Sequence, residues 1–164
     1  MAEKEKRMEE IYRQYRNNIY HLCLLYLKDR QRAEDAMQET FFRAWKRFDT
    51  YRGESGEKTW LSAIAANVCR DWLRTPWLRL EKKSVPWEEA ILQAVETQKD
   101  MDAVRAVMSL PVKLREVITL RYYQEMTVPE IAEALRLSVS GVNARLAKAK
   151  NRLRPELREV YFDA

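Results

Sequence analysis

The chain has 164 residues, enough for one domain of ordinary size or two small ones. Its formal charge is +5, and it contains three glycines, five prolines and two cysteines. This composition favours helices over sheets and excludes a disulfide framework. No apolar run approaches the ~20 residues of a membrane span, and no signal-peptide pattern is present. We expect an all-α, cytoplasmic protein with Cys23 and Cys69 as small buried hydrophobic side chains.

The first part of the chain predicts three amphipathic helices between about residues 8 and 74. Apolar residues recur at three- and four-residue steps from Met8 to Tyr26, which predicts the first helix. The second is expected over residues 31–48, with Phe42 among polar and charged side chains opposite the apolar face. The third is expected over residues 58–74, because a residue that precedes proline, here Thr75, is disfavoured from helical angles.

A connector and a second helical module follow. Residues 76–98 contain two prolines and mixed charge, and a short helix is expected after Pro86. The second module is expected to begin near Lys99, and a proline at the first turn opens its next helix, PVKLREVITLRYY. The predicted organisation is therefore two small helical domains, residues 1–75 and 99–164, joined by a flexible linker at 76–98.

Residues 127–153 predict a helix-turn-helix. Thr127 is a good N-cap, and Glu130 three residues later completes a capping box. In the last long helix the expected inward stripe is Val139, Val142, Leu146, Ala149 and Leu153. The expected outward side chains are Ser140, Asn143, Ala144, Arg145, Lys148, Asn151 and Arg152.

This helix lies in a run from Arg136 to Arg154 that contains no acidic residue. A basic helix presented by a two-helix corner suits a groove lined with phosphates. The alternative is a solvated basic helix end that only complements its own dipole, which leaves the corner unexplained.

Three blocks of the chain resemble the extracytoplasmic-function group of bacterial sigma factors, the small initiation subunits of RNA polymerase. The blocks are AEDAMQETFFRAW at 33–45, WLSAIAANVCRDWLR at 60–74 and LPVKLREVITLRYYQEMTVPEIAEALRLS at 110–138. They occur in the order and spacing of that family. The resemblance implies two helical domains on a tether, without the extra domains of housekeeping sigma factors, and it implies no catalytic residue, metal or cofactor.

The resemblance also implies three binding surfaces. The clamp coiled coil of the largest polymerase subunit would contact Asp35, Gln38, Glu39 and Phe42. The minus-ten promoter element would meet the loop at 49–58 and a polar ridge, through Tyr51, Trp60, Asn67, Arg70 and Arg74. The minus-thirty-five element would be read by Ser140, Asn143, Ala144, Arg145 and Lys148.

Further expected partners follow from the same resemblance. They are the flap of the second-largest polymerase subunit and an anti-sigma factor, which in this group is commonly membrane-anchored. The recognition helix departs from the usual Gly-Thr-Val-Lys-Ser-Arg-Leu, because Gly141 lacks a hydroxyl and Asn143 replaces a cation. Promoter sequence therefore cannot be transferred from better-known members.

The residues also bear on two other function classes. A stand-alone DNA-binding regulator would share the helix-turn-helix but would occupy an operator without polymerase. An enzyme is disfavoured, since His21 and Cys23 point to different sides of a helix and cannot readily share a metal. No glycine-rich phosphate loop or nucleophile elbow is present either.

Overall fold

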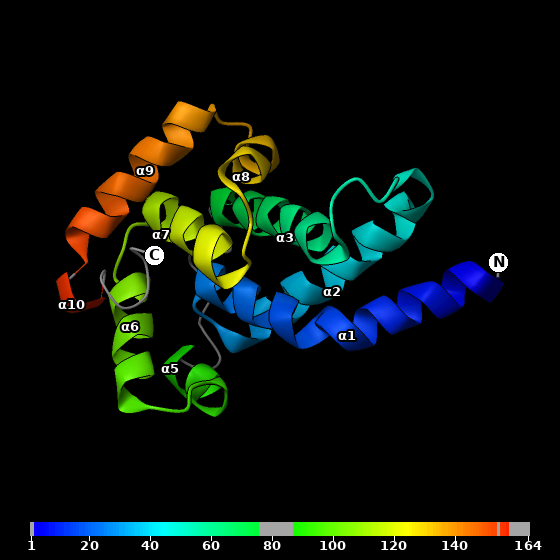
Figure 1. The fold of residues 1–164 in the computed structure, drawn as a ribbon. Helices are drawn as coiled ribbons and strands as arrows, with labels where there is room; N and C mark the ends of the chain where they lie inside the picture. The colour runs from blue at the N-terminus through cyan, green and yellow to red at the C-terminus, as the bar shows by residue number, and fades with distance from the viewer. Residues whose placement is uncertain (1, 76–86, 154, 158–164) are drawn as a thin grey trace.

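The computed structural model describes residues 2–75, 87–153 and 155–157. The regular elements of these residues are helices, which confirms the all-α prediction (Figure 1). Residues 76–86 of the expected connector, and Arg154 of the expected basic run, lie outside the described residues. The short helix expected after Pro86 is confirmed as α5 (Trp87–Ile91), which continues into the 3-10 turn η2 (Leu92–Ala94).

The first module is a three-helix bundle of α1 (Ala2–Leu27), α2 (Arg30–Arg47) and α3 (Glu57–Arg74). Lys28 has a φ of 58° and ends α1, and the Asp29 side chain then caps α2 by accepting from the Arg32 amide at 3.0 Å. α1 begins earlier than expected, because its charged first turns carry no apolar periodicity. α3 ends at Arg74 as predicted, and Cys23 and Cys69 are buried thiols.

The second module begins with α6 (Gln98–Met108) and α7 (Val112–Ile118). The single helix expected from Pro111 to Tyr123 instead changes pitch at Thr119 and continues as the π-helical turn η3 (Thr119–Tyr123). There the amide of Gln124 donates to Thr119 O at 3.1 Å, five residues back. The module ends with α8 (Val128–Leu135), α9 (Val139–Arg152) and the short α10 (Pro155–Leu157).

The two modules pack directly against each other. α3 contacts α8, and α1 contacts α7. Their apolar side chains form one continuous core. Its fully buried members include Ile19, Leu22, Leu24 and Leu61 from the first module and Ile118, Leu120, Met126 and Ile131 from the second. The sequence predicted the modules but left their relative orientation open, and the structure supplies it.

A buried arginine joins the modules at the end of α1. Arg115 on α7 donates from Nε to Leu25 O at 2.7 Å and from Nη2 to Tyr26 O at 3.1 Å. Its Nη1 donates to Leu110 O at 2.8 Å within its own module. Burial lowers the pKa of this guanidinium, with partial compensation from Tyr26 and Glu116. A cation at a helix C-terminus also complements the helix dipole.

Replacing Arg115 should therefore destabilise the protein. Arg115→Met keeps much of the apolar stem but leaves three buried carbonyls without this donor. We expect the free energy of unfolding to fall by about 3 kcal/mol, measured by urea denaturation. The matched control is Arg105→Met, because the exposed Arg105 has only a 3.9 Å ion pair with Asp102. An equal effect of the two substitutions would contradict this account.

Candidate nucleic-acid interface

The helix-turn-helix is defined by local capping interactions. Thr127 Oγ1 accepts from the Glu130 amide at 3.2 Å, and Glu130 Oε1 accepts from the Thr127 amide at 2.8 Å. The predicted N-cap and capping box are thereby confirmed. Arg136 has a φ of 57° and ends α8, after which Ser138 caps α9 by accepting from the Gly141 amide at 3.0 Å.

The inward stripe of α9 is largely as predicted. Val142, Leu146, Ala149 and Leu153 are buried. The prediction for Val139 was wrong, because its side chain is 46% exposed. Val139 is the first residue of the helix, and burial on this face starts only one turn later, at Val142.

Most of the side chains predicted to face outward on α9 are exposed. Ser140, Asn143, Ala144 and Lys148 lie on the open side of the helix, followed by Asn151 and Arg152. Arg145 differs, since it is partly buried and its Nη1 lies 3.9 Å from Glu116 Oε2. That Nη1 has no hydrogen-bond acceptor in the structure. The open face of α9 thus retains Asn143 and Lys148, while Arg145 faces the second module's own interior.

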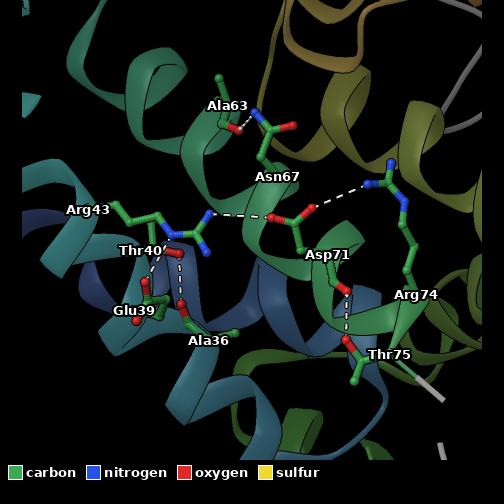
Figure 2. Close-up of polar contacts among 9 residues, drawn as sticks. All are labelled: Ala36, Glu39, Thr40, Arg43, Ala63, Asn67, Asp71, Arg74 and Thr75. Carbon is green, nitrogen blue, oxygen red and sulfur yellow. Dashed lines mark hydrogen bonds and ion pairs between the residues drawn. The ribbon is translucent and has the colours of Figure 1, made fainter. Parts of the chain in front are cut away.

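The polar ridge of α3 is also held by contacts within the chain. Asn67 Nδ2 donates to Ala63 O at 3.0 Å, and the exposed Arg74 donates to Asp71 Oδ1 at 3.3 Å (Figure 2). Arg70 instead faces the second module, where its Nη1 donates to Leu135 O at 3.1 Å. In the ridge predicted from helical spacing, Arg74 is therefore exposed, whereas Arg70 is only partly exposed.

Glu116 on α7 lies where these cations converge. Its Oε1 is 3.5 Å from Arg70 Nε, and its Oε2 is 3.9 Å from Arg145 Nη1. Tyr26 donates its hydroxyl proton to Oε1 at 2.7 Å. Burial raises the pKa of the Glu116 carboxyl, opposed by the Tyr26 hydrogen bond and by Arg70, Arg145 and Arg115. Burial and Glu116 together raise the pKa of Tyr26 well above its usual value.

Sequence reasoning missed this cluster. The available signal was the pair Arg115-Glu116 inside the otherwise apolar run LREVITL. Buried charges require partners, so two adjacent charges in such a run indicate a polar cluster in the core. The pattern does not say which distant residues supply the partners.

The loop expected near the minus-ten element is tied to α1 and stacked on α3. The rings of Tyr51 and Trp60 lie 4.4 Å apart at an interplanar angle of 17°. The Tyr51 hydroxyl donates to Ser55 O, and Glu57 forms an ion pair with Arg7 of α1. The two predicted aromatic residues are therefore brought together as one stacked pair.

On the α2 face predicted to bind polymerase, Asp35, Gln38 and Phe42 are exposed, and Glu39 is partly buried. Phe42 is 52% exposed, with Lys46 Nζ 4.3 Å from its ring centroid. Asp35 accepts from Gln31 at 3.0 Å, and Gln38 donates to the Tyr12 hydroxyl at 3.2 Å. An exposed aromatic ring rimmed by polar groups is typical of a protein-binding surface.

A chain of charges connects this face to the ridge of α3. Arg43 donates to Glu39 at 2.9 Å, and its Nη1 lies 3.6 Å from Asp71 Oδ2 (Figure 2). Asp71 accepts in turn from Arg74. Glu39 and Arg74, predicted to meet different partners, thus belong to one alternating series of charges across α2 and α3.

The described residues contain no group of histidine, cysteine and carboxylate side chains suited to a metal ion. None of the helices in the described part of the chain is both long and apolar enough to cross a membrane.

Comparisons with known proteins agree with the order of the two modules. The family model for Sigma-70 region 2 matches residues 11–79, and the model for Sigma-70, region 4 matches residues 100–153. The chain belongs to the sigma-70 family.

Its relatives place this sigma factor in the extracytoplasmic-function (ECF) group. It is 30% identical to ECF RNA polymerase sigma factor SigM of Bacillus subtilis, over 90% of this chain and 93% of the relative. It is 28% identical to ECF RNA polymerase sigma factor SigX of the same organism, over 97% of this chain and 89% of the relative. The fold resembles sigma factor RpoE of Bartonella quintana, solved in complex with the anti-sigma factor NepR, with a TM-score of 0.75 at 23% identity over 94% and 98% of the chains.

An apolar cavity of about 450 Å³ lies between the modules of the sigma factor. It is lined by α1, η2, α6 and η3, and His21 of α1 lies at its wall. Burial lowers the pKa of His21 below 6.5. A histidine in this position contributes to folding in its neutral form.

The sign of the pH dependence follows from this shift. The unfolded chain binds a proton at His21 near pH 6.5, whereas the folded chain binds it only at lower pH. The contribution of His21 is thus complete above pH 6.5 and declines as the pH falls through 6.5 towards the folded pKa. As the pH falls through this range, the free energy of unfolding of the wild type should decline relative to that of His21→Gln. The decline should be at most about 1.4 kcal/mol per pH unit.

His21 is the single histidine of the chain, so nuclear magnetic resonance can follow its titration without overlap. The urea-unfolded protein supplies the reference titration. A folded-state pKa at or above that of the unfolded protein would contradict the burial described here.

Proposed function

We propose that this sigma factor binds core RNA polymerase and directs it to promoters with minus-ten and minus-thirty-five elements. The observation that carries the proposal is the presence on one chain of region 2 and region 4, each with an exposed polar face. Sigma factors are initiation factors and not enzymes, so catalysis belongs to the polymerase. We further propose that the protein acts in the cytoplasm, where RNA polymerase works.

We assign different binding partners to the two modules. Residues 1–75 would hold polymerase through the α2 face and the minus-ten element through α3 and its loop. Residues 99–164 would hold the minus-thirty-five element through α9 and the flap of the second-largest subunit, with residues 76–98 as connector. The exposed Asn143 suits paired hydrogen bonds to adenine, and Lys148 suits a phosphate.

We also propose an anti-sigma factor as a partner. Support comes from the fold shared with RpoE, which was solved with the anti-sigma factor NepR. Such an inhibitor would cover polymerase-binding surfaces of this chain, and it would be membrane-anchored, as is common for partners of this group.

Binding to core polymerase tests the role of the α2 face. Phe42→Ala removes the exposed ring without altering the buried stripe of α2. We expect about tenfold to thirtyfold weaker binding to core enzyme and a parallel loss of run-off transcription, since aromatic anchors carry much of an interface's energy. Leu92→Ala is the control, because Leu92 is 57% exposed and lies outside the face.

Two outcomes would count against these assignments. If Phe42→Ala binds core enzyme as tightly as Leu92→Ala, the α2 face is not the contact. If the wild-type protein never binds core enzyme and instead protects an operator alone, the protein is a stand-alone regulator.

Salt dependence tests the contact of α9 with DNA. Lys148→Ala should weaken holoenzyme binding to a promoter by a similar factor for different sequences and reduce the slope of log K against log salt by about 1. Lys113→Ala removes the same charge from an exposed position on α7. Fluorescence anisotropy over a range of salt concentrations measures both slopes. Identical slopes for the two variants would remove Lys148 from the proposed phosphate contacts.

A further inference from the structure

We propose that Glu116 is an internal competitor of promoter DNA. It engages Arg70 of region 2 and Arg145 of region 4, and so holds both modules in a closed arrangement that opens before promoter binding. This inference rests on the proposed function, because Arg70 and Arg145 are cations that the family resemblance places at the minus-ten and minus-thirty-five elements.

The position of Glu116 supports this role. Its side chain is 3% exposed and lies on α7, which is situated between α9 and α3 (Figure 1). One carboxylate oxygen faces Arg70 at 3.5 Å and the other faces Arg145 at 3.9 Å. A single buried carboxylate thus partly neutralises one cation from each of the two proposed DNA-binding surfaces.

These contacts compete with a DNA contact by the same side chains. Arg70 also donates to Leu135 O, the last residue of α8, and so connects α3 to the helix-turn-helix. Nη1 of Arg145 is buried. The side chains of Arg70 and Arg145 are only 24% and 26% exposed, so a phosphate outside α3 or α9 competes with Glu116 for each guanidinium group. Binding of both arginines to DNA therefore requires their side chains to leave Glu116.

The boundary between the modules also contains polar contacts beside the apolar core. Gln124 donates to Asn18 at 2.7 Å and to Ser62 at 2.7 Å, so it connects the end of η3 to both α1 and α3. Buried ion pairs contribute little net stability once their desolvation is included. DNA phosphates offer many negative groups in exchange for one carboxylate. The closed arrangement can thus be stable in the free protein and still yield to a promoter complex.

The variant Glu116→Gln tests the proposal. It removes the charge that attracts Arg70 and Arg145 while keeping the size of the side chain. Without polymerase, we expect about fivefold or greater tighter binding to a minus-thirty-five duplex, together with a larger radius of gyration in small-angle X-ray scattering. Glu133→Gln is the matched control, because it makes the same charge change at an exposed position of α8.

A second variant keeps the test decisive if Glu116→Gln loses helicity by circular dichroism. Gln124→Ala breaks the contacts with Asn18 and Ser62 without touching a residue assigned to DNA or polymerase. It should increase the radius of gyration as Glu116→Gln does, because it weakens a contact between the modules.

The outcomes separate this inference from the proposed function. If the wild-type protein directs run-off transcription, but neither opening variant exceeds Glu133→Gln in DNA affinity or radius of gyration, the competition by Glu116 is overturned. If the wild-type protein fails to direct transcription with core enzyme, the proposed function itself is overturned.

Discussion

The carbonyl groups of Leu25 and Tyr26, at the end of α1, have no amide donor within their own helix, and they lie where the second module packs against the first. Arg115 satisfies both of them from α7, while its own Nη1 remains bonded to Leu110. In the same turn of α1, the Tyr26 hydroxyl donates a hydrogen bond to Glu116 of α7. The end of α1 therefore fixes α7, and α7 in turn determines where α9 lies relative to α3.

Local sequence signals predicted much of this fold. The capping box at Thr127, the stop before Pro76 and the stripes of α2 and α9 depend on neighbours within a few residues, so helical periodicity was enough to place them. The π-helical turn at Thr119 was not predictable in this way, because it changes the hydrogen-bond pitch without a proline or glycine to mark it.

The candidate site was predicted less completely, for a related reason. Helical spacing correctly placed Phe42, Asn143 and Lys148 on open faces. It also placed Arg70 and Arg145 outward, whereas the structure turns both towards Glu116. Arg70 meets Leu135 across 65 positions of sequence, and no periodic pattern carries information over that separation. Contacts between modules therefore had to come from the structure.

The continuous apolar core has a consequence for the lifetime of the protein. Ile118 and Leu120 share that core with α1 and α3, so separation of the modules uncovers side chains that are otherwise dry. A chain in that state is a substrate for proteases and a seed for aggregation until another macromolecule shields it. Turnover of this protein should thus be governed by how often it separates while alone, and its cellular abundance by the supply of molecules that shelter it.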